Sequence, residues 1–374
     1  MTRFNNSTQA FLALLRAGLW ETDVRLSRFN PIDFTRVLTL AEEQSVVGLV
    51  AAGLEHVIDL KVPKVEVLQF VGQALKLEQD NSAMNYFINV IIDKMKEVGI
   101  SSLLVKGQGI AQCYERPLWR ACGDVDLLLD DDNYSKAKAF LIPLANSVEQ
   151  EDVYCKHQGM TIQSWVIEIH GNMNTELSFR IDGFLARLQS KLFEKQSFRV
   201  WKNGEVTVLL PEINTDIIFI FTHFLKHFYK GGLGLRQICD WCRLLWAYKE
   251  SVNIPLLEEY LKQMGLFSEW RVFAVFAVNY LGLPIEAMPL YSTDRKWRRK
   301  AQRVATFIMK VGNMGHNRDI SYYKYPYLMR KSVSMWRKVS DVFNHAMIFP
   351  LDSFRFLSNL MLHGFRSAAN QLKR

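Results

Sequence analysis

The chain has 374 residues, of which 49% are hydrophobic and 22% charged, and its formal net charge is +8. These values are typical of an ordinary soluble globular protein that is long enough for two or three domains. We expect no membrane-spanning helix, because no segment of the sequence reaches the roughly 18 to 20 apolar residues that a span needs. The nearest candidate, residues 272–285, is interrupted by Asn279 and Pro284 and predicts a buried helix.

The five cysteines are scattered and odd in number, which indicates reduced thiols and a cytoplasmic protein. Cys239 and Cys242 have the C-x-x-C spacing. A zinc site needs about four ligands, however, and no second pair follows, so we interpret both as structural thiols. The apolar run that begins at Ala10 is broken by Arg16 and lacks a small-residue cleavage site, so we expect no signal peptide.

Residues 1–95 have the apolar spacing of helices and form an expected N-terminal helical region. Ser7 and Thr8 are placed to cap a first helix, and residues 31–33 open a second. The helical pattern continues over residues 65–75 and 84–98. No residue in this region suggests chemistry.

The spacing of apolar residues changes from the helical to the strand period after residue 100, and residues 96–212 predict a small mixed α/β domain. Strands are expected over residues 102–106, 125–129, 165–170, 198–201 and 206–210. Residues 153–156 and 160–163 predict a hairpin that turns at Gln158 and Gly159. Helices are expected over residues 107–114, from about 132 to 141, and from about 174 to 195.

Residues 213–374 form an expected C-terminal helical region. A long helix begins at residues 214–215 and breaks at Gly231 and Gly232, and the next helix covers residues 236–246. The fold class is therefore α+β: a small mixed-sheet domain flanked by two helical regions.

The basic residues concentrate in the C-terminal tail. From Tyr291 onward there are 17 Lys and Arg against 4 Asp and Glu, which leaves residues 1–290 with a net charge of −5. Residues 297–300 and 335–338 mix Trp with cations, a pattern that suits nucleic acid, anionic lipid or polyanionic glycans. The pattern also suits a solvated helix face whose long side chains cover apolar surface, and we favour this second interpretation.

Asp124 and Asp126 are the most informative residues of the chain. Alternate residues of a strand share a face, so the two carboxylates point the same way with Cα atoms roughly 6.5 Å apart. Val125 and Leu127 then face the core. Neighbouring carboxylates repel each other unless a cation lies between them. Their oxygen ligands suit magnesium best, with manganese as the second candidate.

Two further motifs belong with this pair. Glu168 lies between isoleucines on the strand over residues 165–170 and shares a face with His170. Three carboxylates on one sheet face can hold divalent metal. Lys106, Gly107, Gln108 and Gly109 form a strand-to-helix turn whose backbone N–H groups could approach a phosphate.

The ordered set of motifs resembles the nucleotidyltransferases of the DNA polymerase beta superfamily, and more closely a bacterial family described only as uncharacterised nucleotidyltransferase. The resemblance covers roughly residues 85–250. It is carried by the following motifs in chain order: Leu104-Val105-Lys106-Gly107, Tyr114, Pro117, Arg120, Asp124-Val125-Asp126, Glu168-Ile169-His170, His223-Phe224-Leu225-Lys226-His227, Arg236 and Asp240. In one departure, Gln108 follows Gly107 where the superfamily usually has Ser or Gly.

The resemblance implies that Asp124, Asp126 and Glu168 are the catalytic, metal-binding carboxylates. It implies that Lys106, Gly107 and Gln108 lie near the phosphates, with Arg120 binding phosphate or pairing with a carboxylate. Further possible cleft residues each have more than one interpretation. His170 is a site residue or a packed imidazole. His223 and His227 form a metal pair, a phosphate clamp or simple packing, and Arg236 and Asp240 form an ion pair or a part of the site.

The function implied is the magnesium-dependent transfer of a nucleoside monophosphate from an NTP to an acceptor, with release of pyrophosphate. The acceptor, whether a small molecule, a sugar, a protein or a nucleic acid, is not indicated. One alternative is a catalytically inactive module that docks on an anionic membrane or a polyanion through the basic tail. Another is a toxin that modifies transfer RNA or a protein.

Overall fold

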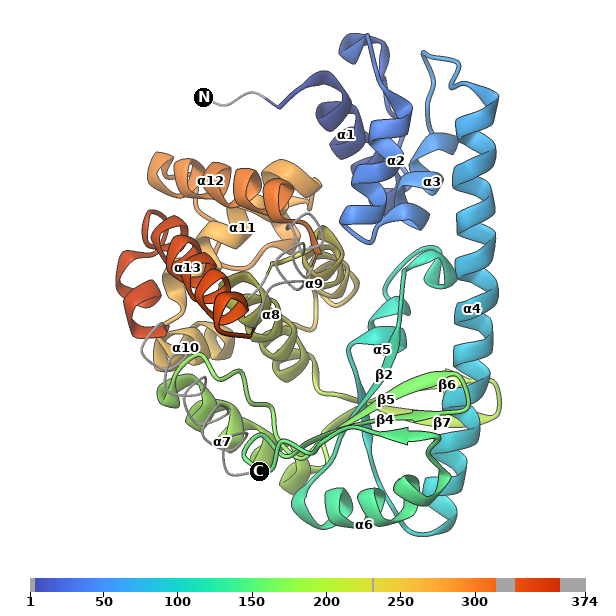
Figure 1. Ribbon diagram of the computed structural model, residues 1–374, viewed down its shortest axis with the longest axis vertical. Coiled ribbons are helices and arrows are strands. Elements are labelled where there is room, and N and C mark those ends of the chain that lie inside the picture. Colours follow the sequence, from blue (N-terminus) through green and yellow to red (C-terminus); the bar gives the residue numbers. More distant parts are fainter. Residues whose placement is uncertain (1–3, 231, 314–326, 357–374) are drawn as a thin grey trace.

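A computed structural model describes residues 4–230, 232–313 and 327–356 of the chain. Over these residues, one seven-stranded mixed sheet is surrounded by helices, which confirms the expected fold class (Figure 1). The strands are β1 (Leu103–Val105), β2 (Asp124–Leu128), β3 (Ser147–Val148), β4 (His157–Ile162), β5 (Trp165–His170), β6 (Phe198–Asn203) and β7 (Val206–Pro211). The strand order across the sheet is β3-β4-β5-β2-β1-β7-β6.

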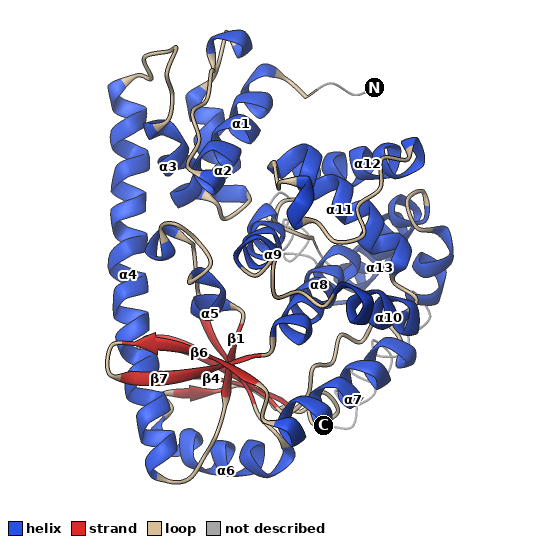
Figure 2. Ribbon diagram, turned by 180° about the vertical axis from the view of Figure 1, so that it is seen from behind, coloured by secondary structure: helices blue, strands red, loops and turns tan. Residues whose placement is uncertain are grey.

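Helices precede, interrupt and follow the strands along the chain. The α-helices are α1 (Asn6–Trp20), α2 (Phe34–Glu43), α3 (Val47–Glu55), α4 (Lys64–Glu97), α5 (Gly107–Ala111), α6 (Asp131–Leu141), α7 (Phe179–Lys195), α8 (Ile213–Lys230), α9 (Leu235–Ala247), α10 (Ile254–Met264), α11 (Phe267–Leu281), α12 (Arg295–Val311) and α13 (Tyr327–Ala346). Figure 2 shows the strands as one twisted layer with helices on both sides.

The central strands β1, β2 and β5 position the residues of interest. β2 runs parallel to β5 and antiparallel to β1. In the parallel register Asp126 lies opposite Glu168, and Leu128 lies opposite His170. Parallel neighbours with the same register turn matching residues to the same face of the sheet, so the β2 and β5 polar side chains meet.

The two faces of the sheet have different environments. One face carries Val125, Leu127 and Ile167 into an apolar cluster that α4 and α6 complete, as the alternation in β2 predicts. The opposite face carries the polar residues of β2 and β5. Because β2 is buried on its apolar side, a shift of one residue would turn its carboxylates into the core, and the register is therefore strongly specified.

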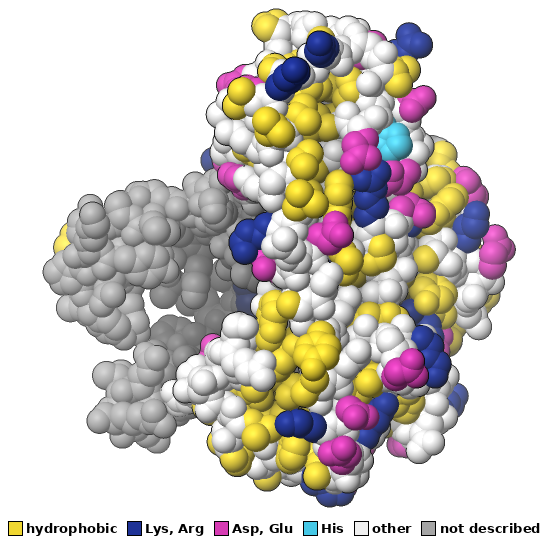
Figure 3. Space-filling view, turned by 90° about the vertical axis from the view of Figure 1, so that its right-hand side faces the viewer, with side chains coloured by type: hydrophobic (Ala, Val, Ile, Leu, Met, Phe, Trp, Pro, Cys, Tyr) yellow, Lys and Arg dark blue, Asp and Glu magenta, His cyan; other side chains and the backbone are white. Residues whose placement is uncertain are grey.

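Helix α4 is one continuous helix of 34 residues, where the sequence indicated two separate helical patterns. Its second half covers the sheet, and its first half packs against α3 (Figure 1). Apolar side chains gather on the outer face of the molecule shown in Figure 3, and α4 contributes exposed Val65, Leu68 and Leu75. The charged residues between the two predicted patterns are compatible with a solvated helix surface. The apolar spacing is therefore lost between the two patterns, although the helix is continuous.

The structure corrects four local predictions, of which the first is the position of a hairpin turn. Gln158 and Gly159 are inside β4 rather than at a turn, and the hairpin partner of β4 is β5. The β4–β5 connection passes through Gln163, which has a positive φ of 56°. Gly159 indicated a turn by residue type, but the close approach of Glu149 to this position accounts for the glycine within the strand.

The other corrections concern helix boundaries. Helix α1 begins one turn earlier than predicted, with Asn5 as its cap. Helix α5 ends at Ala111 instead of continuing to Tyr114. Helix α7 begins after the Ser178 cap, and residues 174–178 precede it as a loop. Each observed boundary lies about two to five residues from the predicted one.

The helices after residue 213 build the largest apolar core together with α1 to α3. Trp241, Trp270, Phe221 and Phe273 lie at its centre, in edge contact with one another. Cys239 and Cys242 are fully buried there as free thiols. Within the described residues, no helix is both long and apolar enough to cross a membrane.

The first basic stretch of the tail lies on α12. This helix buries one face, including Val304 and Ile308, and exposes Arg298 and Arg299. Trp297 packs beneath Lys296 and Lys300. These contacts are typical of a solvated amphipathic helix. In the second stretch, Trp336 is exposed on α13 and the side chains of residues 335, 337 and 338 lie outside the described part; contact with an anionic surface stays a prediction.

Candidate functional site

Three carboxylates converge on the polar face of the central strands. Asp124 and Asp126 extend from β2 and Glu168 from the neighbouring β5, and one ligand oxygen from each lies within 4.8 Å of the others. Asp126 is 2% exposed, whereas Asp124 and Glu168 are half-buried and open toward solvent. The structure thus brings together the three acids that the strand periodicity placed on one face.

Cationic and imidazole groups surround this trio. The Lys106 Nζ lies 2.7 Å from Asp126 Oδ1, and the His170 Nε2 lies 2.8 Å from the same oxygen. His157, at the start of β4, lies 3.2 Å from Glu168 Oε2. His170 is therefore a member of the site, and His157 orients Glu168 from the far strand.

The trio is electrostatically unequal. Burial would raise the pKa of Asp126, but Lys106 and His170 outweigh it and hold that pKa well below its usual range. Burial and the charge of Asp126 raise the pKa of Asp124. No side-chain hydrogen bond or ion pair joins the Asp124 carboxylate to another described residue, so its charge is the least compensated of the three.

The donor set fits a hard divalent cation. Carboxylate oxygens are the ligands that magnesium prefers, and the close spacing of three acids needs positive charge between them. In this structure the Lys106 ammonium supplies part of that charge. Burial alone would lower its pKa, but Asp126, Asp124 and Glu168 raise it instead. Asp124 and Glu168 retain the open oxygens at which a metal ion would be held.

Lys106 reaches the acids from a strained turn. It follows β1 with φ 57° and ψ −147°, close to a region that glycine populates and that other residues rarely do. Gly107 follows with φ 41°, and a Cβ at Gly109 would lie 2.9 Å from Leu210. The two glycines therefore permit a tight turn and a close approach of α5 to β7, and the backbone aims Lys106 at Asp126.

We expect Lys106→Ala and Lys106→Gly to differ in stability but not in activity. Both variants lose the ammonium group. Only the glycine variant relieves the backbone strain, which costs about 1–3 kcal/mol at such positions. Lys106→Gly should therefore unfold at a higher urea concentration than Lys106→Ala, while both lose about tenfold or more in pyrophosphate release. Equal unfolding midpoints would contradict the strain, and an active variant would contradict the role of the charge.

Gln108 is turned away from the carboxylates. Its side chain is 1% exposed and its Nε2 donates to Asn81 Oδ1 of α4 at 2.7 Å. The Asn81 amide in turn donates to the carbonyls of Leu118 and Arg120. At the position where the superfamily usually has Ser or Gly, this chain thus has the Gln108 amide, which hydrogen-bonds the turn after β1 to α4.

Arg120 is committed to a buried ion pair. Its Nε and Nη2 donate to the two carboxylate oxygens of Asp240 at 2.9 and 2.7 Å, and the Tyr114 hydroxyl donates to Asp240 at 2.7 Å. Both Arg120 and Asp240 are buried. Of the two interpretations of Arg120, the geometry favours the pair with a carboxylate, because its guanidinium group is enclosed at the junction of α9 with residues 114–120.

Arg236 pairs differently from the interpretation based on its spacing from Asp240. Its Nη1 donates to the Ala121 carbonyl at 3.0 Å, and its charge partly offsets the rise in the pKa of nearby Asp124 that burial causes. His223 and His227 contact each other through their Nε2 atoms at 3.0 Å, and neither belongs to a group of potential metal ligands among the described residues. The structure therefore does not support a metal pair on α8.

Sequence reasoning missed His157, Lys226 and Lys230. His157 was hidden by the misplaced hairpin turn. The two lysines continue the spacing of His223 and His227 on α8, at i+3 and i+7 from His223, and this periodicity could have indicated one shared face.

The site thus combines a strand–turn–helix unit with carboxylates on two parallel strands. The profile of the uncharacterised nucleotidyltransferase family matches residues 30–282, and the chain belongs to this family. Comparisons with curated proteins and with solved structures give no match. The expected family is thereby confirmed, and with it a general assignment as a nucleotidyltransferase.

Proposed function

We propose that the protein transfers a nucleoside monophosphate from an NTP to an acceptor hydroxyl or similar nucleophile. The acceptor oxygen attacks the α-phosphorus, the bond from that phosphorus to the bridging oxygen breaks, and pyrophosphate leaves. The convergence of Asp124, Asp126 and Glu168 beside Lys106 carries this proposal. Membership of a nucleotidyltransferase family supports it.

Each side chain has a role in this scheme. Asp124, Asp126 and Glu168 would hold magnesium or manganese, which when bound neutralises phosphate charge and favours ionisation of the acceptor. Glu168 is also placed to accept the acceptor proton. Its hydrogen bond to His157 lowers the pKa of Glu168 and keeps the carboxylate ionised. Lys106 stabilises negative charge on the phosphates, and His170 orients Asp126.

We expect transfer to depend completely on a divalent cation. Incubation with NTPs labelled at the α-phosphate, together with small-molecule and macromolecular fractions of a cell extract, should label one fraction and release pyrophosphate. Excess chelator should abolish the label, because without a cation the three acids, of which Asp124 is the least compensated, repel the phosphates, and added magnesium should restore it. Label transfer that persists in chelator would contradict the role of the carboxylates.

The catalytically inactive alternative gives a separate result. An inactive module would bind nucleotide or an anionic surface without releasing pyrophosphate from any NTP or fraction. An exposed-surface variant, Asp132→Asn on α6, serves as the matched control because Asp132 is exposed, pairs with Lys136 and does not belong to the group of three acids. Growth arrest on expression that depends on Asp126 would instead identify a toxin.

A further inference from the structure

One helix presents a single polar stripe in an otherwise apolar environment. Fourteen of the eighteen residues of α8 are buried. The four that are not are His223, Lys226, His227 and Lys230, which lie at i, i+3, i+4 and i+7 and therefore share one face. The stripe carries two ammonium groups and two imidazoles, and no acid of α8 lies on it.

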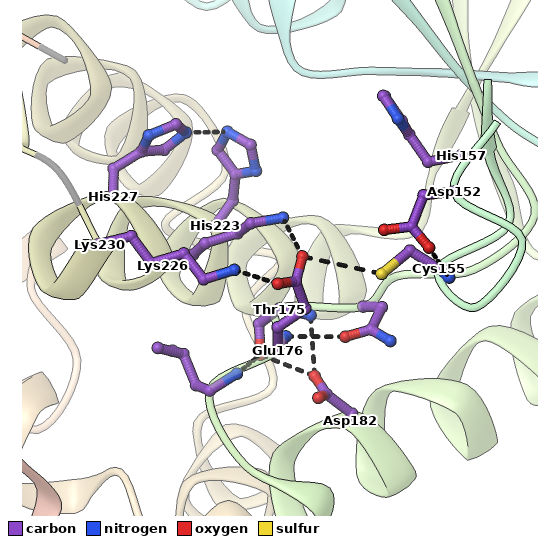
Figure 4. A network of polar contacts seen from close by, with 12 residues as sticks. Asp152, Cys155, His157, Thr175, Glu176, Asp182, His223, Lys226, His227 and Lys230 are labelled. Carbon is purple, nitrogen blue, oxygen red and sulfur yellow. Dashed lines mark hydrogen bonds and ion pairs between the residues drawn. The ribbon is translucent and has the colours of Figure 1, made fainter. Parts of the chain in front are cut away.

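The stripe lies near residues that surround the three carboxylates. Figure 4 shows the stripe on one side of Glu176 and His157 on the other. His157 contacts Glu168, one of the three acids, at 3.2 Å. In agreement with this placement, burial and the charge of Lys106 lower the pKa of both His223 and His227.

Glu176 binds both lysines of the stripe. Its Oε1 lies 3.4 Å from Lys226 Nζ and its Oε2 contacts Lys230 Nζ. Glu176 lies in the segment between β5 and α7 and has a positive φ of 59°, a conformation that costs energy for a residue other than glycine. The contact therefore holds a strained backbone position in place.

Glu176 is shared between the two lysines. Burial and the charge of Lys226 lower the pKa of Lys230 in spite of its contact with Glu176. Asp152 and Cys155 approach Glu176 closely enough to form a group of potential metal ligands. Two ammonium groups already supply cationic charge to Glu176, however, so a metal ion is disfavoured there.

We propose that the α8 stripe binds the terminal phosphates of the nucleoside triphosphate, and that Glu176 is an exchangeable counter-ion that those phosphates displace. This inference rests on the proposed nucleotidyl transfer and extends it to the binding of the leaving pyrophosphate. Lys226 and Lys230 act as paired point charges for phosphate oxygens, and the one imidazole N–H that the His223–His227 hydrogen bond leaves free donates to them. Glu176 pairs with both lysines until the phosphates, which carry more negative charge, displace it.

Calorimetric titration of the full chain with inorganic tripolyphosphate in the presence of magnesium tests the proposal. The double variant Lys226→Ala/Lys230→Ala should weaken binding about tenfold or more, because two charged contacts are lost. Glu176→Gln should tighten binding about threefold, because the competing carboxylate is removed. Lys262→Ala, an exposed lysine of α10 paired with Glu258, is the matched control and should bind as the unaltered chain does.

The opposite signs of the two variants separate ligand binding from a purely structural ion pair. If Glu176 only fastened its loop to α8, both variants would weaken binding or leave it unchanged, and either result would overturn the proposal. Absence of tripolyphosphate binding to the unaltered chain would overturn it as well. Release of pyrophosphate is measured separately, so an active enzyme with unchanged tripolyphosphate affinity in every variant refutes this inference alone, and an inactive chain with the expected affinities refutes the transfer alone.

Discussion

Replacing Asp126 by Asn is expected to lower the rate of pyrophosphate release by about a thousandfold. Asp126 is the most buried of the three acids and contacts both Lys106 and His170. Asparagine keeps an oxygen that can accept those hydrogen bonds but removes the negative charge that a metal ion needs. Expressed as a free energy, the loss of transfer rate should be far larger than the loss of unfolding free energy, which is measured in urea on the same variant.

The comparison with the other acids sharpens this test. Asp124→Asn and Glu168→Gln should show losses of similar size, because each contributes one ligand oxygen to the same group. The surface variant Asp132→Asn should retain full activity. If Asp126→Asn kept more than about a tenth of the activity, the trio would not be the reacting centre, since loss of a single charged group in such sites costs far more.

Breaking the Arg120–Asp240 pair is expected to cost about 3–5 kcal/mol of the free energy of unfolding, because one buried charge is left without its partner. Arg120→Ala and Asp240→Asn should each show this loss in urea unfolding. The double variant Arg120→Met/Asp240→Leu should be less destabilised than either single variant, because it leaves no unpaired charge in the interior. Tyr114→Phe should cost about 1 kcal/mol through its lost hydrogen bond.

The activity of these variants distinguishes a structural from a ligand-binding Arg120. A ligand-binding arginine would give a folded variant with normal stability and a raised KM for NTP. Arg120→Ala with unchanged stability would therefore contradict the buried pair that we describe.

The pair also has a pH signature. Burial would raise the pKa of Asp240, but Arg120 outweighs burial and lowers it. A carboxylate whose folded-state pKa lies below its unfolded value contributes stability above the unfolded pKa, near pH 4, and loses it as the pH falls through the folded value. The Asp240→Asn variant should lack this part of the acid dependence of unfolding.

Much of the catalytic face could be predicted from local pattern. Alternation in β2 separates Asp124 and Asp126 from Val125 and Leu127, and the same alternation in β5 places Glu168 with His170. A strand with one buried face tolerates only one register, so side-chain direction follows from the chain itself. The glycines after Lys106 likewise indicated the strand-to-helix turn.

Contacts between distant segments could not be predicted in the same way. Spacing alone favoured Arg236 as the partner of Asp240, yet Arg120, remote in sequence, is the residue that meets it. Gln108 was expected near phosphate, but Asn81 of α4 binds its amide. Glycine suggested a turn at Gly159, whereas cross-strand pairing keeps that residue inside β4.

The amino-acid sequence by itself determined the α+β class, the face on which three acids lie and the order of the family motifs, since these depend on the short periods of strands and helices. Only the tertiary structure decided which polar side chains are paired inside the protein and which lie near the carboxylates. Arg120 and Gln108 are paired inside the protein, Lys106 contacts Asp126, and the lysines of the α8 stripe contact Glu176. The physical reason is that a buried polar group takes its partner from whatever segment packing brings within reach, and that choice is set by the arrangement of helices around the sheet rather than by distance along the chain.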